Sequence, residues 1–545
     1  MKHSFRTLAE VFEYSTSKYS RRPAYSEYGG GGSVLTYADV HEKCGILARL
    51  LLNFGIKASD KVAIFSQNMP NWAISFMSIV SSGRIAVPML TELTENEITN
   101  ILTHSESKAL FVSKKFFSRI PEPLLDKMKI IVATDDFTIL RTGEGAYTCD
   151  GTISNPLPDD IAAIIYTSGT TGDAKGVMLS HKNFCANIYE SWHAHKVRRR
   201  DVFLSILPLA HTYELSIGML YPFAVGALVY YLPKPPTPSI LIPALKKVRP
   251  TAMLSVPLVI EKIYRSSIAP TMEKSRFLRR IKKFSPALMY RLVGMRLMGT
   301  FGGRIRFFGI GGAKLDPEVE DFLHRAAFPY SIGYGVTEAA PLICNASPFK
   351  TCVGSTGIAS KGVRIRLDNV NPATGEGEIV IKGDNVMRGY FKDYERTRKV
   401  LSYDGWFHTG DIASMDRKKR YFIRGRLGNM IVGPSGENIY PEEIENVLNK
   451  LPYIDDSLVT ERDGHLVALV HLDEKALGMD YEDEDRFLEE LEKKKQDILD
   501  FVNRQVNRNS RIGEVRVEKE PFIKTATMKI RRFLYKKDEK NNQTN

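Results

Sequence analysis

The sequence predicts an α/β protein with a large N-terminal domain of parallel-rich sheets covered by helices, followed by a small α+β lid domain. Apolar segments of strand length, 61–65, 85–89 and 109–112, alternate with helical patterns at 71–79 and 95–103. This alternation is typical of a covered, largely parallel sheet. A chain of 545 residues also exceeds a single ordinary core, so at least two domains are expected.

The pattern of the chain changes after about residue 428. Shorter elements follow, and we expect a helix at 441–450, a strand at 465–473, a helix at 483–508 and a strand at 513–519. The predicted domains are therefore 1–427 and 428–545.

Composition narrows the class of protein. Hydrophobic residues make up 43% and charged residues 26%, as in soluble globular proteins. The five cysteines are scattered without C-x-x-C spacing, which favours free thiols in a reducing compartment and no zinc site. The first ten residues lack the apolar core of a secretory signal. We therefore expect a cytoplasmic protein.

One uncharged segment, 215–232, approaches the length of a membrane span. Pro222, Gly218 and Gly226 interrupt it, and 18 residues is the lower limit for spanning. A buried helix followed by a strand is the expected structure.

The most informative stretch is 166–181, YTSGTTGDAKGVMLSH. It follows an apolar strand pattern at 161–166, and Ser180 begins a helical pattern. Its glycines allow the backbone to approach an anionic oxygen closely, and Lys175 adds a positive charge. The loop is not a Walker A motif, because Gly169 and Gly172 are too close together and Gly176 follows the lysine. On composition alone, a solvated turn would explain it equally well.

This string closely resembles the phosphate-binding signature of the AMP-forming adenylating enzymes, which include acyl-CoA synthetases, peptide-synthetase adenylation domains and beetle luciferases. Ala174 departs from the proline that many members carry. The resemblance implies that the loop binds ATP and that Thr170 also contributes to catalysis and to a Mg²⁺ site. The loop residues implied to bind ATP are Thr167, Ser168, Gly169, Thr170, Thr171, Gly172 and Lys175.

Two glycine-rich motifs follow in the order that the family predicts. The segment 309–317 is expected to form a strand, a tight loop and a helix start, and the resemblance places adenine and the acyl carbonyl at Gly311, Gly312 and Ala313. The segment GYGVTE at 333–338 resembles the adenine motif. Tyr334 offers an aromatic face for stacking, and Glu338 is a hard carboxylate suited to Mg²⁺.

The remaining members of the adenine motif and one upstream histidine complete the substrate side of the predicted site. Gly335 and Thr337 are implied to contact the nucleotide, and Gly333 to border the substrate pocket. The segment AHTYE at 210–214 resembles a second substrate motif, so His211 is implied to line the carboxylate or acyl pocket. A lone histidine without that resemblance is more often structural.

The next motifs are expected to hold the ribose. Asp411, in WFHTGDIA, is implied to accept both ribose hydroxyls, which suits an acceptor-only carboxylate. A structural Asp in a turn after Gly410 is the alternative. Arg426 is implied to reach the ribose or phosphate, whereas segment 377–390 is expected to have mainly a packing role.

The C-terminal motifs resemble a hinge and a catalytic lysine. Gly428 replaces the usual Asp or Lys at the hinge, and Gly436 is implied to border a CoA tunnel. Lys529 matches the lysine of the adenylation step, although Met528 replaces the usual glycine and Lys524 lies close enough to be an alternative match.

These motifs together imply a long-chain fatty-acid–CoA ligase that uses ATP, Mg²⁺ and coenzyme A and forms an acyl-adenylate intermediate. An acyl-carrier-protein acceptor, an aromatic or medium-chain acid, and a non-catalytic family member remain alternatives. The acyl length does not follow from the sequence, because a pocket's depth depends on side chains from distant segments.

The net charge of +13 is concentrated in one stretch. Residues 265–306 contain eleven Lys and Arg against one Glu, a net charge of +10. Phe277, Ile281, Phe284 and Leu288 recur there at helical spacing, with Pro286 limiting the helix. The pattern fits peripheral contact with anionic lipid on the inner face of the membrane, or simply a solvated basic helix. Nucleic-acid binding is not expected, because no recognised reading motif accompanies the charge.

Overall fold

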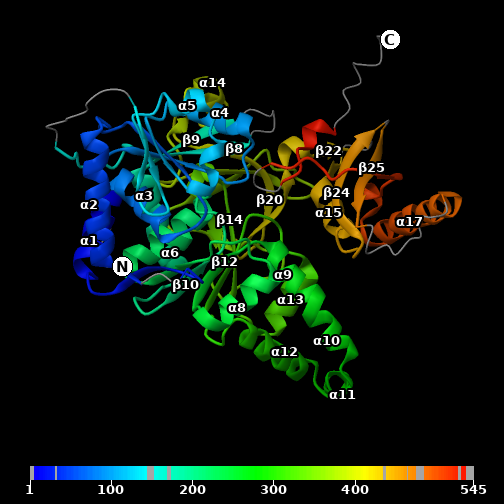
Figure 1. Cartoon of the computed structure of the whole chain (residues 1–545). Coiled ribbons are helices and arrows are strands. Elements are labelled where there is room, and N and C mark those ends of the chain that lie inside the picture. Colours follow the sequence, from blue (N-terminus) through cyan, green and yellow to red (C-terminus); the bar gives the residue numbers. More distant parts are fainter. Residues whose placement is uncertain are drawn as a thin grey trace, which may run out of the picture.

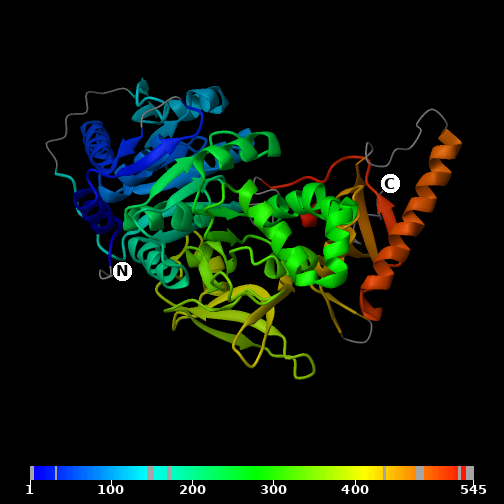
Figure 2. The same cartoon turned by 90° about the horizontal axis from the view of Figure 1, so that it is seen from below.

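The computed structural model describes residues 5–30, 34–143, 152–168, 174–433, 437–462, 464–473, 484–525 and 529–535. Figures 1 and 2 show a large N-terminal part and a smaller C-terminal part beside it. The predicted α/β class is confirmed.

The first sheet of the large part carries the sequence pattern that predicted it. Its order is β19 (Gly389–Tyr390), β9 (Ala174–Ser180), β8 (Ile161–Ser168), β4 (Ile85–Met89), β3 (Lys61–Phe65), β5 (Ala109–Val112), β6 (Ile130–Ala133) and β7 (Ile139–Thr142). The strands from β8 to β6 are parallel, whereas those at both edges pair antiparallel.

Alternate residues of β3 face different helices, because side chains of a strand point to opposite faces in turn. Val62 and Ile64 pack in the same cluster as α3 (Pro70–Ser81), and Ala63 and Phe65 pack with α4 (Glu95–Ser105). Two short helical elements, η1 (Lys114–Arg119) and α5 (Glu122–Leu125), lie between β5 and β6.

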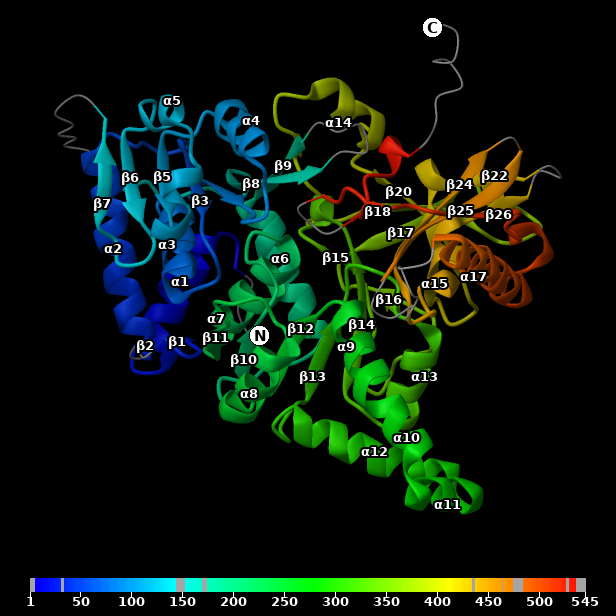
Figure 3. The ribbon, with the colours of Figure 1, turned by 45° about the vertical axis from the view of Figure 1, so that its right-hand side comes forward.

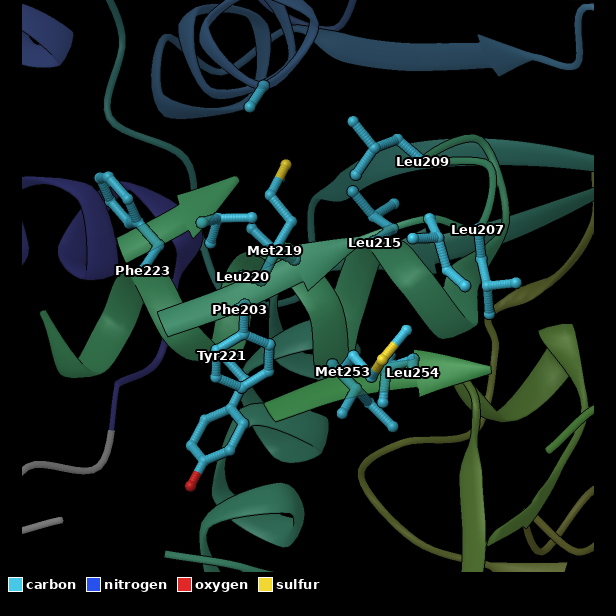
Figure 4. Packing of buried hydrophobic residues seen from close by; sticks show 14 of the residues in the cluster. Phe203, Leu207, Leu209, Leu215, Met219, Leu220, Tyr221, Phe223, Met253 and Leu254 are labelled. Carbon is cyan, nitrogen blue, oxygen red and sulfur yellow. The ribbon is translucent and has the colours of Figure 1, made fainter. Parts of the chain in front are cut away.

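The second sheet runs in the order β16 (Ile358–Ala359), β15 (Leu342–Asn345), β14 (Tyr330–Gly335), β13 (Phe307–Ile310), β12 (Ala252–Ser255), β10 (Val202–Ser205), β11 (Leu228–Tyr231), β1 (Pro23–Glu27) and β2 (Leu35–Thr36). Its strands are parallel from β14 to β1. One hydrophobic cluster joins both sheets, and Figure 4 shows the part around β10 and β12.

Helices surround the second sheet and connect its strands. They are α1 (Leu8–Lys18), α2 (Tyr37–Asn53), α6 (His181–Ala194), η2 (Glu214–Leu220), α7 (Tyr221–Val225), α8 (Pro238–Val248), α9 (Pro257–Ile263), η3 (Tyr264–Ile268), α10 (Ala269–Lys274), α11 (Arg276–Phe284), α12 (Pro286–Thr300), α13 (Pro317–Arg325) and η4 (Thr337–Ala339). Of these, η2 and η3 are π-helical. Helix α6 begins after Ser180, as the sequence predicted, and Ser180 and Asn183 form a capping box there.

The uncharged segment 215–232 is a buried helical stretch, η2 and α7, followed by strand β11, as expected. Within the described residues, no helix combines the length and apolar character needed to cross a membrane.

A third, antiparallel sheet has the order β17 (Arg364–Asp368), β18 (Gly377–Lys382), β20 (Phe407–Met415) and β21 (Tyr421–Arg426), with α14 (Tyr394–Val400) nearby. It lies between the two large sheets and the C-terminal part (Figure 3).

The C-terminal part is a small sheet domain with its own core. Its elements are η5 (Leu427–Asn429), β22 (Ile431–Val432), β23 (Asn438–Ile439), α15 (Pro441–Leu448), β24 (Ile454–Arg462), β25 (His465–Leu472), α17 (Glu484–Gln505), η6 (Arg508–Ser510), β26 (Glu514–Val517) and η7 (Arg532–Leu534). Residues of α15, α17, β24, β25 and β26 form one hydrophobic cluster. The strand β24, which pairs antiparallel with β25, was not predicted.

Candidate active site

The carboxyl edge of the second sheet has a topological switch point at β10. This strand pairs in parallel with β11 on one side and with β12 on the other, so the chain reverses its direction across the sheet there. Ligands of open α/β sheets bind at such switch points. The glycine-rich motifs after β13 and in β14 open onto this edge of the sheet.

Three polar side chains from separate segments meet at this edge. Lys175 Nζ of β9 lies 2.9 Å from Glu338 Oε1 of η4. Tyr390 Oη of β19 lies 3.0 Å from Lys175 Nζ and donates a hydrogen bond of 2.9 Å to Glu338 Oε1. Glu338 is buried, which alone would raise the pKa of its carboxyl, but Lys175 and Tyr390 outweigh this and hold that pKa below its usual value. The carboxylate is therefore kept ionised inside the protein.

Tyr390 was not predicted as a site residue, because segment 377–390 was expected to have mainly a packing role. The side chain does pack in the core, yet its hydroxyl contacts two of the charged residues predicted for the site. Lys175 Nζ also lies 4.6 Å from the centre of the Tyr390 ring. No sequence signal brings residue 390 beside residue 175, since that contact depends on the pairing of β19 with β9.

A second polar cluster is built on Asp411. The residue lies within strand β20 rather than in a turn, and it is buried. Tyr334 donates a hydrogen bond of 2.7 Å to Asp411 Oδ2, and Arg426 Nε lies 2.9 Å from Oδ1. Register pairing of β20 with β21 sets Asp411 opposite Arg426. Three residues predicted for nucleotide binding are thus in direct contact.

Both clusters border the same cavity, which has a volume of about 350 Å³. Its lining includes Lys175, Glu338 and Tyr390 of the first cluster and Arg426 of the second. The other lining residues are Val336, Glu378, Lys399, Val400, Phe407, His408, Thr409, Gly410 and Leu427.

The glycines predicted to border the nucleotide and substrate differ in whether, and for what structural reason, glycine is required. Gly312 has a φ of +89°, which favours glycine, and a Cβ at Gly311 would lie 3.3 Å from the Tyr213 ring. A Cβ at Gly335 would lie 2.0 Å from the Pro341 carbonyl oxygen, so that glycine is required by packing. A Cβ at Gly333 would meet nothing closer than 3.7 Å. Ala313 and Thr337 occupy the loop after β13 and the start of η4.

Lys529 of the C-terminal part lies in the same charged environment. The pKa of its ammonium is lowered by loss of solvation and by the nearby positive charge of Arg426. The negative charges of Asp411 and Glu338 act in the opposite direction, and the residue as a whole is exposed. His211 is within electrostatic reach of Lys529, and burial lowers the pKa of its imidazole to about 4. His211 is therefore neutral at neutral pH.

The structure separates the two lysines that the sequence left as alternatives. Lys524 Nζ lies 2.6 Å from Asp456 Oδ2 within the C-terminal part, whereas the charges acting on Lys529 are those of the cavity. Arg531, two residues further on, lies with Nη2 2.6 Å from Glu97 Oε1 of α4. This ion pair joins the C-terminal part to the first sheet's helix.

Some predicted residues fall outside the described part of the chain. Gly169, Thr170, Thr171, Gly172 and Gly436 are among them, as is Met528. Ser168 ends β8, and only its backbone pairing with Ala174 is described. Thr167 pairs with Lys175 across β8 and β9, and its hydroxyl is buried without a hydrogen-bond partner among the described residues. Gly428 lies in the exposed turn η5, where a Cβ would meet nothing within 4 Å.

These residues fit a nucleotide together with Mg²⁺ better than a free metal ion. Within the described ranges, no group of three or more His, Cys, Asp or Glu could hold a metal by itself. Glu338 supplies one hard carboxylate, and Mg²⁺ is commonly held by one or two carboxylates plus substrate phosphates. The orphaned Thr167 hydroxyl and the Lys175 ammonium provide groups for phosphate oxygens.

The fold and this arrangement of residues define the class of adenylate-forming acid–thiol ligases. The family model described as "AMP-binding enzyme" matches residues 12–391. The chain therefore belongs to the AMP-binding enzyme family.

Several known proteins are similar over most of the chain. Long chain acyl-CoA synthetase 6 (peroxisomal) of Arabidopsis thaliana is 30% identical, covering 81% of this chain and 69% of that protein. From the same plant, 4-coumarate–CoA ligase 1 is 29% identical (93% and 88%), and the chloroplastic long-chain-fatty-acid–[acyl-carrier-protein] ligase AEE15 is 27% identical (97% and 85%). The solved O-succinylbenzoate coenzyme A synthetase of Bacillus subtilis, in complex with ATP and magnesium ion, is 20% identical with a TM-score of 0.76, over 96% and 98% of the two chains.

Proposed function

We propose that this protein is a long-chain fatty-acid–CoA ligase that converts ATP, a fatty acid and coenzyme A into acyl-CoA, AMP and diphosphate. The observation that carries the proposal is the cavity lined by Lys175 and Glu338, with Lys529 close enough for Asp411 and Glu338 to act on its ammonium. Two cations and a held carboxylate suit the joining of two anions, a carboxylate and a triphosphate.

The first half-reaction is the attack of a carboxylate oxygen on the α-phosphorus of ATP. A new phosphorus–oxygen bond forms, the bond to the bridging oxygen breaks, and diphosphate leaves. We assign Lys529 to neutralise the α-phosphate and the carboxylate, so that these like charges can approach. Lys175 and the loop after β8 hold the β- and γ-phosphates.

The nucleotide's remaining groups are assigned to the second cluster. Asp411 accepts hydrogen bonds from the ribose hydroxyls, Arg426 orients Asp411, and Tyr334 places its ring beside the base. Glu338, with Thr170, would hold Mg²⁺, which supplies charge neutralisation at the phosphate oxygens. Lys175 would then have to release Glu338 to the metal and turn to phosphate.

The second half-reaction brings a thiol to the acyl carbonyl. The thiolate sulfur attacks the carbonyl carbon, the carbon–oxygen bond to AMP breaks, and AMP leaves. Because Lys529 lies within electrostatic reach of Asp411 and Glu338 in this structure, we propose that residues 428–545 form a lid that turns about Gly428 between the two steps. Gly436 would then border the CoA tunnel.

The apolar character of the segment around His211 in the sequence supports an aliphatic acid. Leu207, Leu209 and Leu215 flank this residue in the chain and pack with Leu254 of β12 (Figure 4). Neutral imidazole at His211 also avoids a buried positive charge in this apolar environment. The long-chain relative at 30% identity supports the same assignment. The similar identities of the aromatic-acid and carrier-protein ligases keep those substrates as alternatives to be tested.

The test is AMP release by purified protein with Mg²⁺ and ATP. The acids run from butyrate to stearate and include 4-coumarate, and the acceptors are CoA and a phosphopantetheinylated acyl-carrier protein. We expect the highest kcat/KM with long saturated acids and CoA. A preference for 4-coumarate or for the carrier protein would replace the substrate assignment, and no AMP release with any acid would contradict the enzyme class.

A further inference from the structure

The helical protrusion at α11 presents a basic surface that has no role in the cavity. We define the basic tip as residues 274–296, which comprise the end of α10, all of α11 and most of α12. No residue of α11 is buried. Figures 1 and 3 show α11 at the far end of the helical region formed by α9 to α12, projecting from the body of the protein.

Two aromatic side chains on α11 are exposed without a packing role. Phe277 is 66% exposed and Phe284 is 90% exposed. They are seven residues apart, so they point in nearly the same direction from the helix. Leu278 and Ile281, by contrast, pack against the core. The exposed phenylalanines are therefore not needed to hold α11 in place.

Two more apolar side chains are exposed on α12. Leu288 and Met295 are 49% and 63% exposed, and they too are seven residues apart. Contiguous exposed apolar side chains on a charged surface mark an interaction site more often than isolated ones do.

Unpaired positive charge surrounds these apolar side chains. At either end of the wider basic stretch, Arg265 pairs with Asp316 and Arg306 pairs with Asp201. The basic residues of the tip itself are exposed, and none of those in α10 and α11 forms an ion pair with another described residue: Lys274, Arg276, Arg279, Arg280, Lys282 and Lys283. The tip therefore keeps its charge for an external partner.

We propose that the basic tip docks the protein onto an anionic lipid surface. Lysine and arginine at the interface attract anionic headgroups, and phenylalanine inserts at the boundary with the acyl chains. The tip is a convex projection, which can meet a flat bilayer, whereas aromatic platforms for single-stranded nucleic acid lie in grooves. The distance of the tip from the cavity residues also means that docking leaves them free.

The chain supplies a matched control for the effect of charge. Arg417, Lys418 and Lys419 form an exposed basic cluster between β20 and β21, outside the tip. The variant R279Q/R280Q/K283Q removes three charges from the tip, and R417Q/K418Q/K419Q removes three from the control cluster. F277S/F284S removes the exposed aromatic rings without changing charge. The six charged residues replaced in the two triple variants are all exposed. Circular dichroism and thermal unfolding check that each variant folds.

The experiment is sedimentation of the full chain with vesicles of phosphatidylcholine alone or mixed with phosphatidylglycerol. We expect binding only to the anionic vesicles. The triple charge variant at the tip and F277S/F284S should each weaken it roughly tenfold or more, and the control triple variant by less than about twofold. AMP release with a water-soluble acid should stay unchanged in all of them.

Three outcomes would overturn the proposal. Equal binding to both vesicle types would exclude an anionic lipid partner. If the tip and control charge variants weakened vesicle binding equally, binding would depend on the net charge of the protein and not on the tip. Binding of a random DNA duplex through the tip without binding to vesicles would make nucleic acid the partner.

Discussion

At the scale of single residues, the site depends on contacts that hold charged groups in place. Glu338 is buried and stays ionised because Lys175 and Tyr390 both contact the same carboxylate oxygen. Neither partner is its neighbour in sequence, since they come from β9 and β19 of the first sheet while Glu338 follows β14 of the second. Loss of either contact should therefore change the position or the ionisation of the remaining residues.

The hydroxyl of Tyr390 should therefore matter for the adenylation step. Tyr390→Phe keeps the ring beside Lys175 but removes the hydrogen bond to Glu338. A hydrogen bond to a charged group contributes about 1.5–3 kcal/mol, so we expect ATP–pyrophosphate exchange to fall roughly 10- to 100-fold. Tyr330→Phe, which loses a hydrogen bond to Glu320 away from the cavity, is the matched control. Equal rates in the two variants would mean that the Tyr390 hydroxyl serves packing alone.

Another buried carboxyl, Glu214, should give the protein a distinct pH dependence of stability. Burial raises the pKa of Glu214 to about 8, above its value in the unfolded chain. Between about pH 4.5 and pH 8 the folded state holds this proton and the unfolded state does not, so stability falls as pH rises. The full change is on the order of 5 kcal/mol, at about 1.4 kcal/mol for each unit of pKa.

Glu214→Gln replaces the carboxyl group with an amide that does not titrate, so it isolates the effect of this ionisation on stability. The variant should be more stable than the wild type at pH 8.5, and this advantage should shrink at pH 5.5. The measurement is the midpoint of thermal unfolding of both proteins at both pH values. An advantage of the same size at both pH values would show that Glu214 does not titrate in this range.

At the scale of elements, α4 connects the C-terminal part to the first sheet. Glu97 uses one carboxylate oxygen for the capping box with Thr94 and the other for Arg531. Arg531 is two residues from Lys529, so this ion pair fixes the segment that carries the proposed catalytic lysine. The contact belongs to the conformation in which Lys529 is near the cavity.

Loss of this ion pair should impair adenylation without affecting thioester formation. Arg531→Gln and Glu97→Gln should each lower ATP–pyrophosphate exchange roughly two- to fivefold, the effect of a partly exposed ion pair of up to about 1 kcal/mol. The double variant should be no worse than either single variant, because both remove the same interaction. Glu95→Gln, an exposed position in the same helical turn, is the control.

Two results would contradict this role for the Arg531–Glu97 pair. Additive losses in the double variant would show that the two residues act separately. An equal loss of thioester formation from supplied acyl-adenylate would show that the pair stabilises the protein as a whole.

Secondary structure was predictable wherever local chemistry determined it. The helix start at Ser180 and the apolar strand at 161–166 appear as expected, as does the break before Pro286. Strand β24 was missed, because its sequence IDDSLVTER lacks regular alternation of apolar and polar residues. Its place as a strand is determined by pairing with β25.

At the scale of the whole molecule, the sequence predicted the motifs of the site but not their contacts. Tyr334, Asp411 and Arg426 were each assigned to the nucleotide from separate motifs. The third sheet pairs Asp411 with Arg426, and Tyr334 reaches Asp411 from β14 of the second sheet. The ion pair of Lys175 with Glu338 joins residues 163 positions apart and depends on how two sheets face each other. Local patterns hold no information about such distances, which arise from packing of the complete fold.

The choice between Lys524 and Lys529 shows the same limit. Both lysines fit the C-terminal motif. They differ in the structure, where Lys524 pairs with Asp456 and Lys529 is under the influence of Asp411 and Glu338. A substitution at each position, Lys529→Ala and Lys524→Ala, therefore makes a matched pair.

The most direct test of the proposed mechanism is the rate of each half-reaction in these two variants. Lys529→Ala should lower acyl-adenylate formation, measured by ATP–pyrophosphate exchange, by about 10²–10³, the effect of losing one oriented charge at a reacting phosphate. It should leave thioester formation from supplied acyl-adenylate near the wild-type rate, and Lys524→Ala should leave both half-reactions nearly unchanged. Equal loss of both half-reactions in Lys529→Ala, or undiminished exchange, would contradict the convergence of Lys529 on the nucleotide.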